Sequence, residues 1–408
     1  MAARSRKHDD HHPDTDDWGM YPLPYSHPPD SSLSPSNTIG FYLRKYRAAI
    51  LTVTIILLFF FYRRSSGDVH AELPPPPPAP PVTNDWSRFA YVQYATDVHS
   101  LCNAYMVFES LHRLGSKAER VLLFPKEWNA ETEDEADRSS QLLARANRLY
   151  NVRLYPMEVL GLDGVVPPGT LEEPSSWETG VTKFRAFELD DFDRVLYFDS
   201  DILLRQHVDE LFLLPSAPIA MLRRYWSDVH HTEWPLSGAM MLIEPNSAEL
   251  DGLWERLQDW RLVPERADDK TYDDDLLDDR FRSSALVLPH RPYFLQTFEF
   301  RKRSHEAYLG SFHGPVDLAK WDAHAELEKA KIVHFNDWPL PKPWIMWPSE
   351  GLEELQPDCP RNVETCPNRD VWLGLYEEFR SRRENLCRIM SVPAHEDWRE
   401  WKKLVGAL

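Results

Sequence analysis

Residues 195–201 read VLYFDSD, four apolar residues followed by two aspartates two positions apart. A run that is apolar throughout is typical of a strand buried on both faces, as in a parallel sheet. In open α/β sheets, ligands bind at the carboxyl ends of the strands, where the loops begin. Asp199 and Asp201 are therefore predicted to lie at the ligand-binding edge of a parallel sheet.

The flanking sequence alternates between strand-like and helix-like patterns. The predicted strands cover 89–95, 121–124, 152–155 and 331–335, and the predicted helices cover 107–114, 141–149, 183–189 and 370–405. Gly115 is expected to end the first helix. This order predicts an α/β fold with a mixed, mostly parallel sheet in a single Rossmann-like domain over residues 87–408.

The composition leaves room for one large domain and argues against one class of partner. The chain has 408 residues, is 42% hydrophobic and carries a formal net charge of -19. This charge repels polyanions, and no basic stripe interleaved with aromatic residues runs along the sequence, so no nucleic-acid partner is expected. The 15 Trp residues suit a protein that stacks rings on sugars, although core packing uses Trp as well.

An uncharged run, AAILTVTIILLFFFY, occupies residues 48–62 between basic clusters. It is shorter than the roughly 20 residues that usually span a bilayer, so flanking aromatic and arginine side chains would have to complete the span. A buried core helix and a cleaved signal peptide are the alternatives, but the run begins far from the N-terminus. We therefore expect a transmembrane signal anchor at 44–64. The basic residues are more numerous before the run, which predicts a cytosolic N-terminus and a single-pass type II protein.

Two segments of biased composition surround this run. Residues 1–43 are rich in Asp, His, Ser and Pro and are expected to form a disordered cytosolic tail. Residues 65–86 contain PPPPPAPP and are expected to form a stiff, Pro-rich stem, although the same prolines would suit an SH3 ligand if they were cytosolic. The four cysteines allow three pairings, of which Cys359 with Cys366 is the closest in sequence. Free thiols are the main alternative; a zinc site is disfavoured because no nearby His completes a ligand set.

The chemistry of the strand ends points to a cation and phosphate groups. Asp199 and Asp201 would repel each other unless a cation lay between them, and hard divalent ions take carboxylate and phosphate oxygens. His334, near the end of the strand KIVHF at 331–335, can complete an Asp, Asp, His ligand set, and Lys342 can supply a point charge for phosphate. The alternatives are a turn that uses Asp freely and a buried, hydrogen-bonded His.

Several segments together resemble one family. TKFRAFELDDFDRVLYFDSDILLRQHVDELF resembles the metal-binding segment of glycosyltransferase family 8, the glycogenin-like retaining transferases, and SGAMMLIEP, YDDDLLD and HFNDWPLPKPW follow in that family's order. LPHRPYFLQTFEFR is similar to a fungal Golgi branch, the alpha-1,2-N-acetylglucosaminyltransferases, also called glucose N-acetyltransferases. The resemblance covers roughly residues 88–345 and implies a GT-A type nucleotide-sugar-binding domain.

The resemblance also implies roles for individual residues. Asp199, Asp201 and His334 would bind Mn²⁺. Asp273 and Asp274 would be the catalytic pair beside the reacting carbon. The donor would be bound by Tyr94, Thr96, Asp97, Lys183, Ser237, Gly238 and Lys342. The enzyme would move a sugar, N-acetylglucosamine or a related hexose, from a UDP-sugar to a glycan acceptor in the Golgi lumen.

The sequence departs from the family pattern at three places. The usual His-x-x-Gly-x-x-Lys-Pro-Trp is longer by two residues and lacks the Gly, Leu236 stands where Asn is expected before Ser237, and Asp274 stands where Gln is expected. A carboxylate at Asp274 could stabilise positive charge on the sugar or act as a nucleophile. Two alternatives stay open: a metal-dependent phosphohydrolase or nucleotidyltransferase, and an inactive, membrane-tethered nucleotide-sugar or glycan-binding protein of the same fold. The solvated start of an acidic helix is the simplest alternative for residues 273–275.

Overall fold

The computed structural model describes residues 45–65, 85–130, 137–167, 177–227, 229–262, 273–310, 321–337, 342–359 and 365–393. The chain divides into two units, residues 1–78 and residues 79–408. The expected tail at 1–43 and nearly all of the expected stem at 65–86 lie outside the described residues.

The first unit contains one described helix, α2 (Arg47–Ser65, 19 residues), over most of the predicted anchor. By length and apolarity, none of the helices within the described ranges qualifies as a membrane-crossing segment. The transmembrane anchor expected at 44–64 stays a prediction.

The second unit is built on a seven-stranded sheet with the order β10-β8-β9-β6-β1-β2-β3. Its strands are β1 (Phe89–Tyr94), β2 (Glu119–Pro125), β3 (Val152–Met157), β6 (Arg194–Phe198), β8 (Ile219–Arg223), β9 (Leu236–Ile243) and β10 (Leu286–Leu288). All neighbouring pairs in this sheet are parallel except those made by β9, which is antiparallel to both β6 and β8. The predicted mixed, mostly parallel α/β sheet is confirmed.

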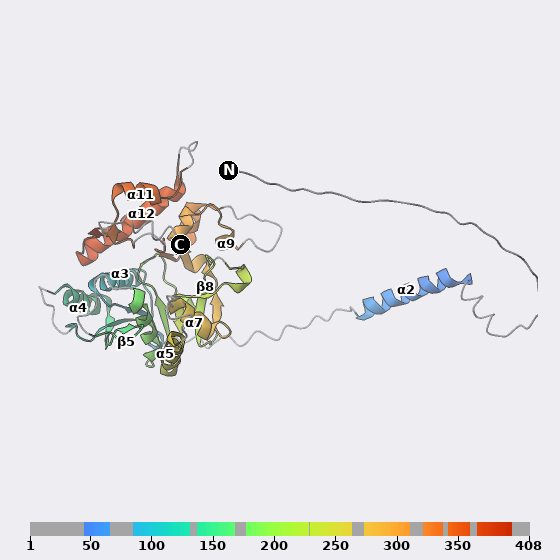
Figure 1. Cartoon of the computed structure of the whole chain (residues 1–408), viewed down its shortest axis with the longest axis horizontal. Helices are drawn as coiled ribbons and strands as arrows, with labels where there is room; N and C mark the ends of the chain where they lie inside the picture. The colour runs from blue at the N-terminus through green and yellow to red at the C-terminus, as the bar shows by residue number, and fades with distance from the viewer. Residues whose placement is uncertain are drawn as a thin grey trace, which may run out of the picture. The chain divides into compact units, whose positions relative to one another are not determined.

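Helices cover both faces of this sheet (Figure 1). α3 (Val98–Arg113) and α4 (Arg138–Tyr150) pack on one face, and α5 (Ser247–Arg261), α7 (Asp273–Phe281) and the 3-10 helix η2 (Trp177–Glu188) pack on the other. α3 and α4 begin earlier than predicted because Asp97 and Asp137 cap them: each side chain accepts a hydrogen bond from a backbone N–H of the first turn. Gly115, with φ of 72°, follows the end of α3 as predicted.

A second, three-stranded sheet joins the segment after β6 to the C-terminal part of the chain. It has the order β11-β12-β7, formed by β11 (Phe294–Gln296), β12 (Ile332–His334) and β7 (Ile202–Leu204). β12 is antiparallel to β7, with His334 opposite Ile202, and the backbone N–H of Phe335 donates to the carbonyl oxygen of Asp201 at 3.0 Å. This register brings His334 beside Asp201 although 132 positions separate Ile202 from His334.

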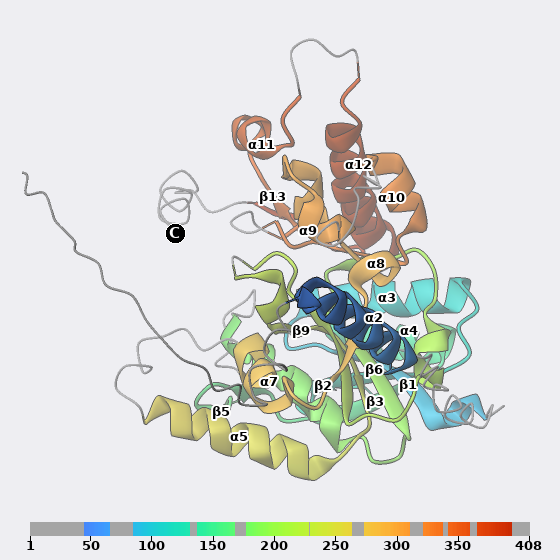
Figure 2. The same cartoon turned by 90° about the vertical axis from the view of Figure 1, so that its right-hand side faces the viewer.

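The C-terminal helices group together at one end of this unit (Figure 2). They are α10 (Ala323–Lys329), α11 (Ser349–Leu355), α12 (Pro367–Arg382) and the π-helical turn η6 (Arg383–Cys387). The helix predicted at 370–405 therefore ends at Cys387, where Arg388 adopts a left-handed φ of 54°. A disulfide joins Cys387 to Cys102 in α3, and a second joins Cys359 to Cys366, the pair that is closest in sequence.

Short elements complete the second unit. They are η1 (Trp86–Arg88), β4 (Leu160–Gly161), β5 (Gly164–Val165), η3 (Asp209–Leu213), η4 (His231–Glu233), α8 (His290–Tyr293), η5 (Thr297–Arg301), α9 (Glu306–Leu309), β13 (Ile345–Met346) and β14 (Val392–Pro393).

Candidate active site

Three predicted metal ligands converge at the carboxyl end of β6. Asp199 and Asp201 follow β6, and His334 ends β12. One ligand atom from each lies within 4.8 Å of the other two, with Nε2 of His334 3.2 Å from Asp201 Oδ1 and 3.6 Å from Asp199 Oδ2. The structure therefore brings together the trio that the sequence predicted.

The donor set of this trio fits a divalent cation. Two carboxylates and one imidazole suit ions such as Mg²⁺, Mn²⁺ or Zn²⁺, and do not by themselves select among them. Nε2 of His334 is buried and has no hydrogen-bond partner among the described residues, as expected for an atom that would bind a cation. Burial alone would raise the pKa of Asp201, but Lys342 and His334 outweigh it and hold that pKa well below its ordinary value. Asp201 is therefore ionised, as a residue that binds a cation has to be.

Two lysines line the same site. Lys342 forms an ion pair with Asp201, and Lys183 pairs with Asp273 and lies 3.5 Å from Asp199. Burial would lower the pKa of each lysine, but the neighbouring carboxylates raise both above the ordinary value. The Lys183 side chain is 7% exposed and the Lys342 side chain 46% exposed, so solvent screens the second pair far more. Both ammonium groups remain charged and can meet phosphate oxygens.

A pocket of about 400 Å³ adjoins the trio. Of the predicted site residues, those that line it are Tyr94, Thr96, Asp97, Lys183, Asp199, Asp201, Asp273 and Lys342. Its other lining residues were not predicted: Gln93, His99, Ser100, Asn103, Thr179, Gly180, Tyr197, Ser200, Trp344 and Ile345. The volume lies within the range of small-molecule sites, and its polar lining suits a charged ligand.

The two acidic residues predicted as the catalytic pair have different surroundings. Asp273 lines the pocket and pairs with Lys183. Asp274 instead accepts hydrogen bonds from the backbone N–H of Gly238 at 2.6 Å and from the hydroxyl of Ser237 at 3.4 Å. Burial, followed by the charge of Asp273, raises the pKa of Asp274 to about 6. Asp273 therefore faces the ligand space, while Asp274 ties the start of α7 to β9.

Two residues predicted to contact the nucleotide also have clear structural contacts. The ring of Tyr94 stacks on Tyr197 with ring centroids 6.0 Å apart, and the Tyr197 hydroxyl donates to Asp199 at 2.7 Å. Asp97 caps α3 through a hydrogen bond from the Ser100 N–H at 2.7 Å. Both residues also line the pocket, so these contacts hold the pocket wall in place.

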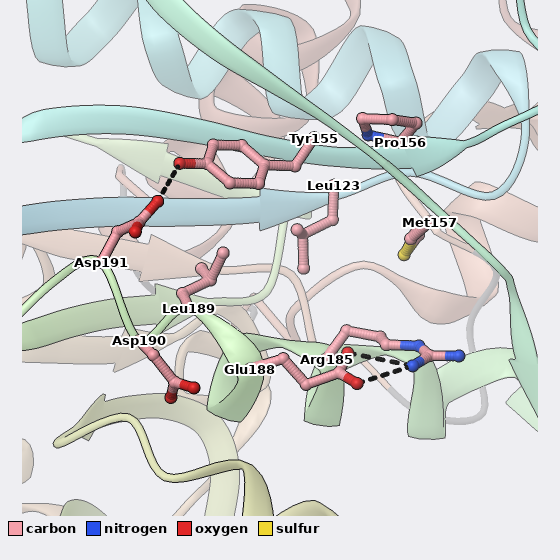
Figure 3. Close-up of a pocket in the computed structure, with 9 residues that line it drawn as sticks. All are labelled: Leu123, Tyr155, Pro156, Met157, Arg185, Glu188, Leu189, Asp190 and Asp191. Atoms are coloured by element: carbon pink, nitrogen blue, oxygen red, sulfur yellow. Dashed lines mark hydrogen bonds and ion pairs between the residues drawn. The ribbon is translucent and has the colours of Figure 1, made fainter.

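A second pocket, of about 220 Å³, lies at the ends of β2 and β3 (Figure 3). Four of its polar residues pair among themselves: Tyr155 donates to Asp191 at 3.2 Å, and Arg185 donates to Glu188 at 2.9 Å. None of the trio residues lines it. The first pocket is therefore the candidate active site.

Other residues of the site carry no local sequence signal. Arg224 donates to Asp275 at 2.8 Å and lies 3.9 Å from Asp274, and Gln296 contacts Nδ1 of His334 at 2.9 Å. Arg383 donates to the side chain of Asn103 across 280 positions. Such contacts depend on the tertiary fold, so a single sequence could not indicate them.

Comparison with known proteins identifies relatives of this chain. It is 41% identical over 324 residues to glucose N-acetyltransferase 1 of Gibberella zeae, covering 78% of this chain and 67% of that protein. It is 42% identical over 318 residues to glucose N-acetyltransferase 1 of Aspergillus fumigatus, covering 76% and 79%. Among solved structures, the galactosyltransferase LgtC matches 76% of this chain and 99% of that one, at a TM-score of 0.46 and 15% identity. No protein-family model matches the chain.

Transfer of a sugar from a nucleotide-diphosphate sugar can use a cation site and cationic side chains beside one pocket, and the carboxyl edge of this sheet offers residues for both. Together with the similarity to the two fungal enzymes, this shows that the chain is a glycosyltransferase. Within that class, it belongs to the glucose N-acetyltransferase 1 family, as its similarity to the two fungal relatives shows.

Proposed function

We propose that this enzyme transfers N-acetylglucosamine from a UDP-sugar to a glycan acceptor with retention of configuration, and that Mn²⁺ bound by Asp199, Asp201 and His334 assists. The observation that carries the proposal is the trio beside a pocket lined by two charged lysines. A bound cation would supply Lewis-acid stabilisation of the diphosphate leaving group.

The other side chains around the pocket are assigned separate roles. Lys183 and Lys342 line the pocket as cations and are placed to bind the diphosphate. Asp273 faces the same space and is the carboxylate assigned to the reacting carbon, where it stabilises positive charge that develops on the sugar. Asp274 is assigned a supporting role, because it holds the Gly238 backbone and does not line the pocket.

The donor follows from the relatives. Two proteins over 40% identical to this chain are named glucose N-acetyltransferase 1, which together with the motif resemblance favours an N-acetylated hexose over other sugars. Tyr94, Thr96 and Asp97 line the pocket at the end of β1 and are assigned to the uridine.

A location in the Golgi lumen is part of the proposal. The two disulfides support it, because disulfides persist in oxidising compartments and are rare in the cytosol. Immunofluorescence of the tagged chain with a Golgi marker tests the location, and carbonate extraction tests whether the chain is attached to the membrane.

The central experiment measures UDP release by the full-length chain. A panel of UDP-sugars is presented with and without Mn²⁺, using the wild type, Asp201→Asn and Asp193→Asn. Asp193 is the control, since it lies at the opposite end of β6 and pairs with Arg88 on the surface. We expect release from UDP-N-acetylglucosamine that needs Mn²⁺, is lost in Asp201→Asn and is unchanged in Asp193→Asn. The anomeric configuration of the product, read by NMR, tests retention.

Other outcomes would change the proposed donor or the proposed activity. Release from a different UDP-sugar would keep the site and change the donor. Binding of UDP with no release, even when a panel of glycan acceptors is added, would favour the inactive binding protein. Absence of both binding and release would refute a nucleotide-sugar site.

A further inference from the structure

Gln296 contacts the ring nitrogen of His334 that faces away from the other two ligands. Gln296 ends β11 and pairs in register with His334 at the end of β12. Its Oε1 lies 2.9 Å from Nδ1 of His334, and the two residues are 0% and 4% exposed. This contact is therefore shielded from water.

The contact determines which nitrogen of His334 can bind a cation. A neutral imidazole carries one proton, and the hydrogen bond made by one nitrogen sets the state of the other. If Oε1 of Gln296 accepts from Nδ1–H, then Nε2 keeps a free lone pair. That lone pair faces Asp201 and Asp199, at 3.2 Å and 3.6 Å.

We propose that Gln296 is a positioning residue of the cation site, which holds His334 in the tautomer and ring orientation that present Nε2 to the ion. The inference rests on the proposed function, since it assumes that the trio binds a divalent cation. Ligand histidines commonly donate their second N–H to an oxygen, which fixes the ring and raises its basicity. An amide does this without adding a third negative charge to the two carboxylates.

The surroundings keep both side chains in place. The ring of Phe294 packs on the imidazole with centroids 5.1 Å apart. The residue after Gln296, Thr297, donates its hydroxyl to the buried carboxylate of Asp337, three residues after His334. β11 and β12 are thus joined by side chains as well as by their ladder, so the backbone of Gln296 is held beside that of His334.

The opposite amide orientation makes a different prediction. If Nε2 of Gln296 donated to Nδ1, the proton of a neutral His334 would lie on its own Nε2, between two carboxylates, and no lone pair would face the ion. The two orientations therefore differ in the tautomer of His334, which can be measured.

The test uses the full-length chain without nucleotide and titrates Mn²⁺ by calorimetry. The variants are Gln296→Leu, which removes the acceptor, Gln296→Glu, which keeps one, and Gln141→Leu. Gln141 is the matched control because it is a buried glutamine in α4 that lines neither pocket. We expect about 10- to 100-fold weaker Mn²⁺ binding in Gln296→Leu, the typical loss for such a partner, wild-type affinity in Gln141→Leu, and affinity no weaker than that of the wild type in Gln296→Glu, which keeps an acceptor and adds a negative charge.

A second measurement tests the proposal even if Gln296→Leu does not fold. Nitrogen-15 NMR of histidine-labelled wild type without metal, with His334→Gln to assign the signal, reports the tautomer directly. Protonation at Nδ1 supports the proposal, and protonation at Nε2 overturns it. Equal Mn²⁺ affinity in Gln296→Leu and the wild type also overturns it while the proposed function stands. A wild type that binds no Mn²⁺ instead refutes the cation site itself.

Discussion

Gly238 stands at a position where even one added methyl group should disturb the site. A Cβ atom built on Gly238 would lie 2.6 Å from Cδ1 of Leu277, 3.0 Å from Oδ1 of Asp274 and 3.7 Å from Oδ2 of Asp273. Leu277 is fully buried, and Asp274 is held by the Gly238 N–H at 2.6 Å. Either the Leu277 side chain or the start of α7 must therefore move in Gly238→Ala.

The expected cost follows from these contacts. Overpacking a core by one methyl group costs about 1–3 kcal/mol, and weakening a hydrogen bond to a charged group adds about 1.5–3 kcal/mol at most. We expect a loss of about 2–4 kcal/mol in the free energy of unfolding. Because the added Cβ would also contact Asp274 and Asp273 at the start of α7, UDP release should fall at least about tenfold, the equivalent of about 1.4 kcal/mol.

Gly252→Ala is the matched control. Gly252 lies in α5, and a Cβ added there meets nothing within 4 Å. Replacing a helical glycine of ordinary φ by alanine stabilises by roughly 0.5–1 kcal/mol. Urea unfolding and initial rates of UDP release for the wild type and both variants give the comparison.

The double variant Gly238→Ala with Leu277→Val separates the steric cause from other causes. Valine lacks the methyl group that clashes, so Leu277→Val should destabilise the Gly238→Ala variant less than it destabilises the wild type. The resulting coupling free energy should be at least about 0.5 kcal/mol. If Gly238→Ala matched Gly252→Ala in stability and in rate, the steric reasoning would be wrong. Additive effects in the double variant would show that Leu277 is not the obstacle.

Three further predictions concern the rest of the unit. The pKa of Asp274 is raised from roughly 3.9 in the unfolded chain to about 6, so the native state binds more protons between these values and loses stability as the pH rises through them. Urea unfolding in the presence of a metal chelator should show the free energy of unfolding of Asp274→Asn increasing relative to that of the wild type between pH 4 and pH 7. A difference between the two free energies that does not change with pH would contradict this. Cys387→Ser removes the bond to Cys102 and should cost about 2–4 kcal/mol by the same assay; an unchanged midpoint would count against a stabilising role. Asp337→Ala leaves three buried donors without their acceptor and should cost at least about 3 kcal/mol, and a loss below 1 kcal/mol would show that water replaces the carboxylate.

The features that the sequence predicted are those with local signals. An apolar run marks β6 as a buried strand, and a strand end followed by Asp199 and Asp201 marks an edge where ligands bind. Periodic apolar residues marked α3 and α4, but their starts were missed because Asp97 and Asp137, which cap them, lie outside the apolar pattern. Local signals therefore identified the elements better than their limits.

The residues that hold the site together come from distant parts of the chain. Gln296 lies 38 positions from His334 and is placed beside it only by the pairing of β11 with β12. The separate surroundings of Asp273 and Asp274 likewise depend on β9, whose backbone meets only Asp274. Adjacent aspartates in a sequence look equivalent, and their different roles follow from the element against which each is packed.

The unusual spacing between His334 and Lys342 raises a physical question, because two added residues and a missing glycine could carry the lysine out of the site. The structure shows that they do not. Lys342 pairs with Asp201 and its Nζ lies 3.4 Å from the carbonyl oxygen of Phe335, so its ammonium group lies beside the end of β12. A lysine has a long, flexible side chain, and its single charge needs no fixed approach angle. The altered spacing therefore still places the charge of Lys342 in the pocket beside Asp199 and Asp201.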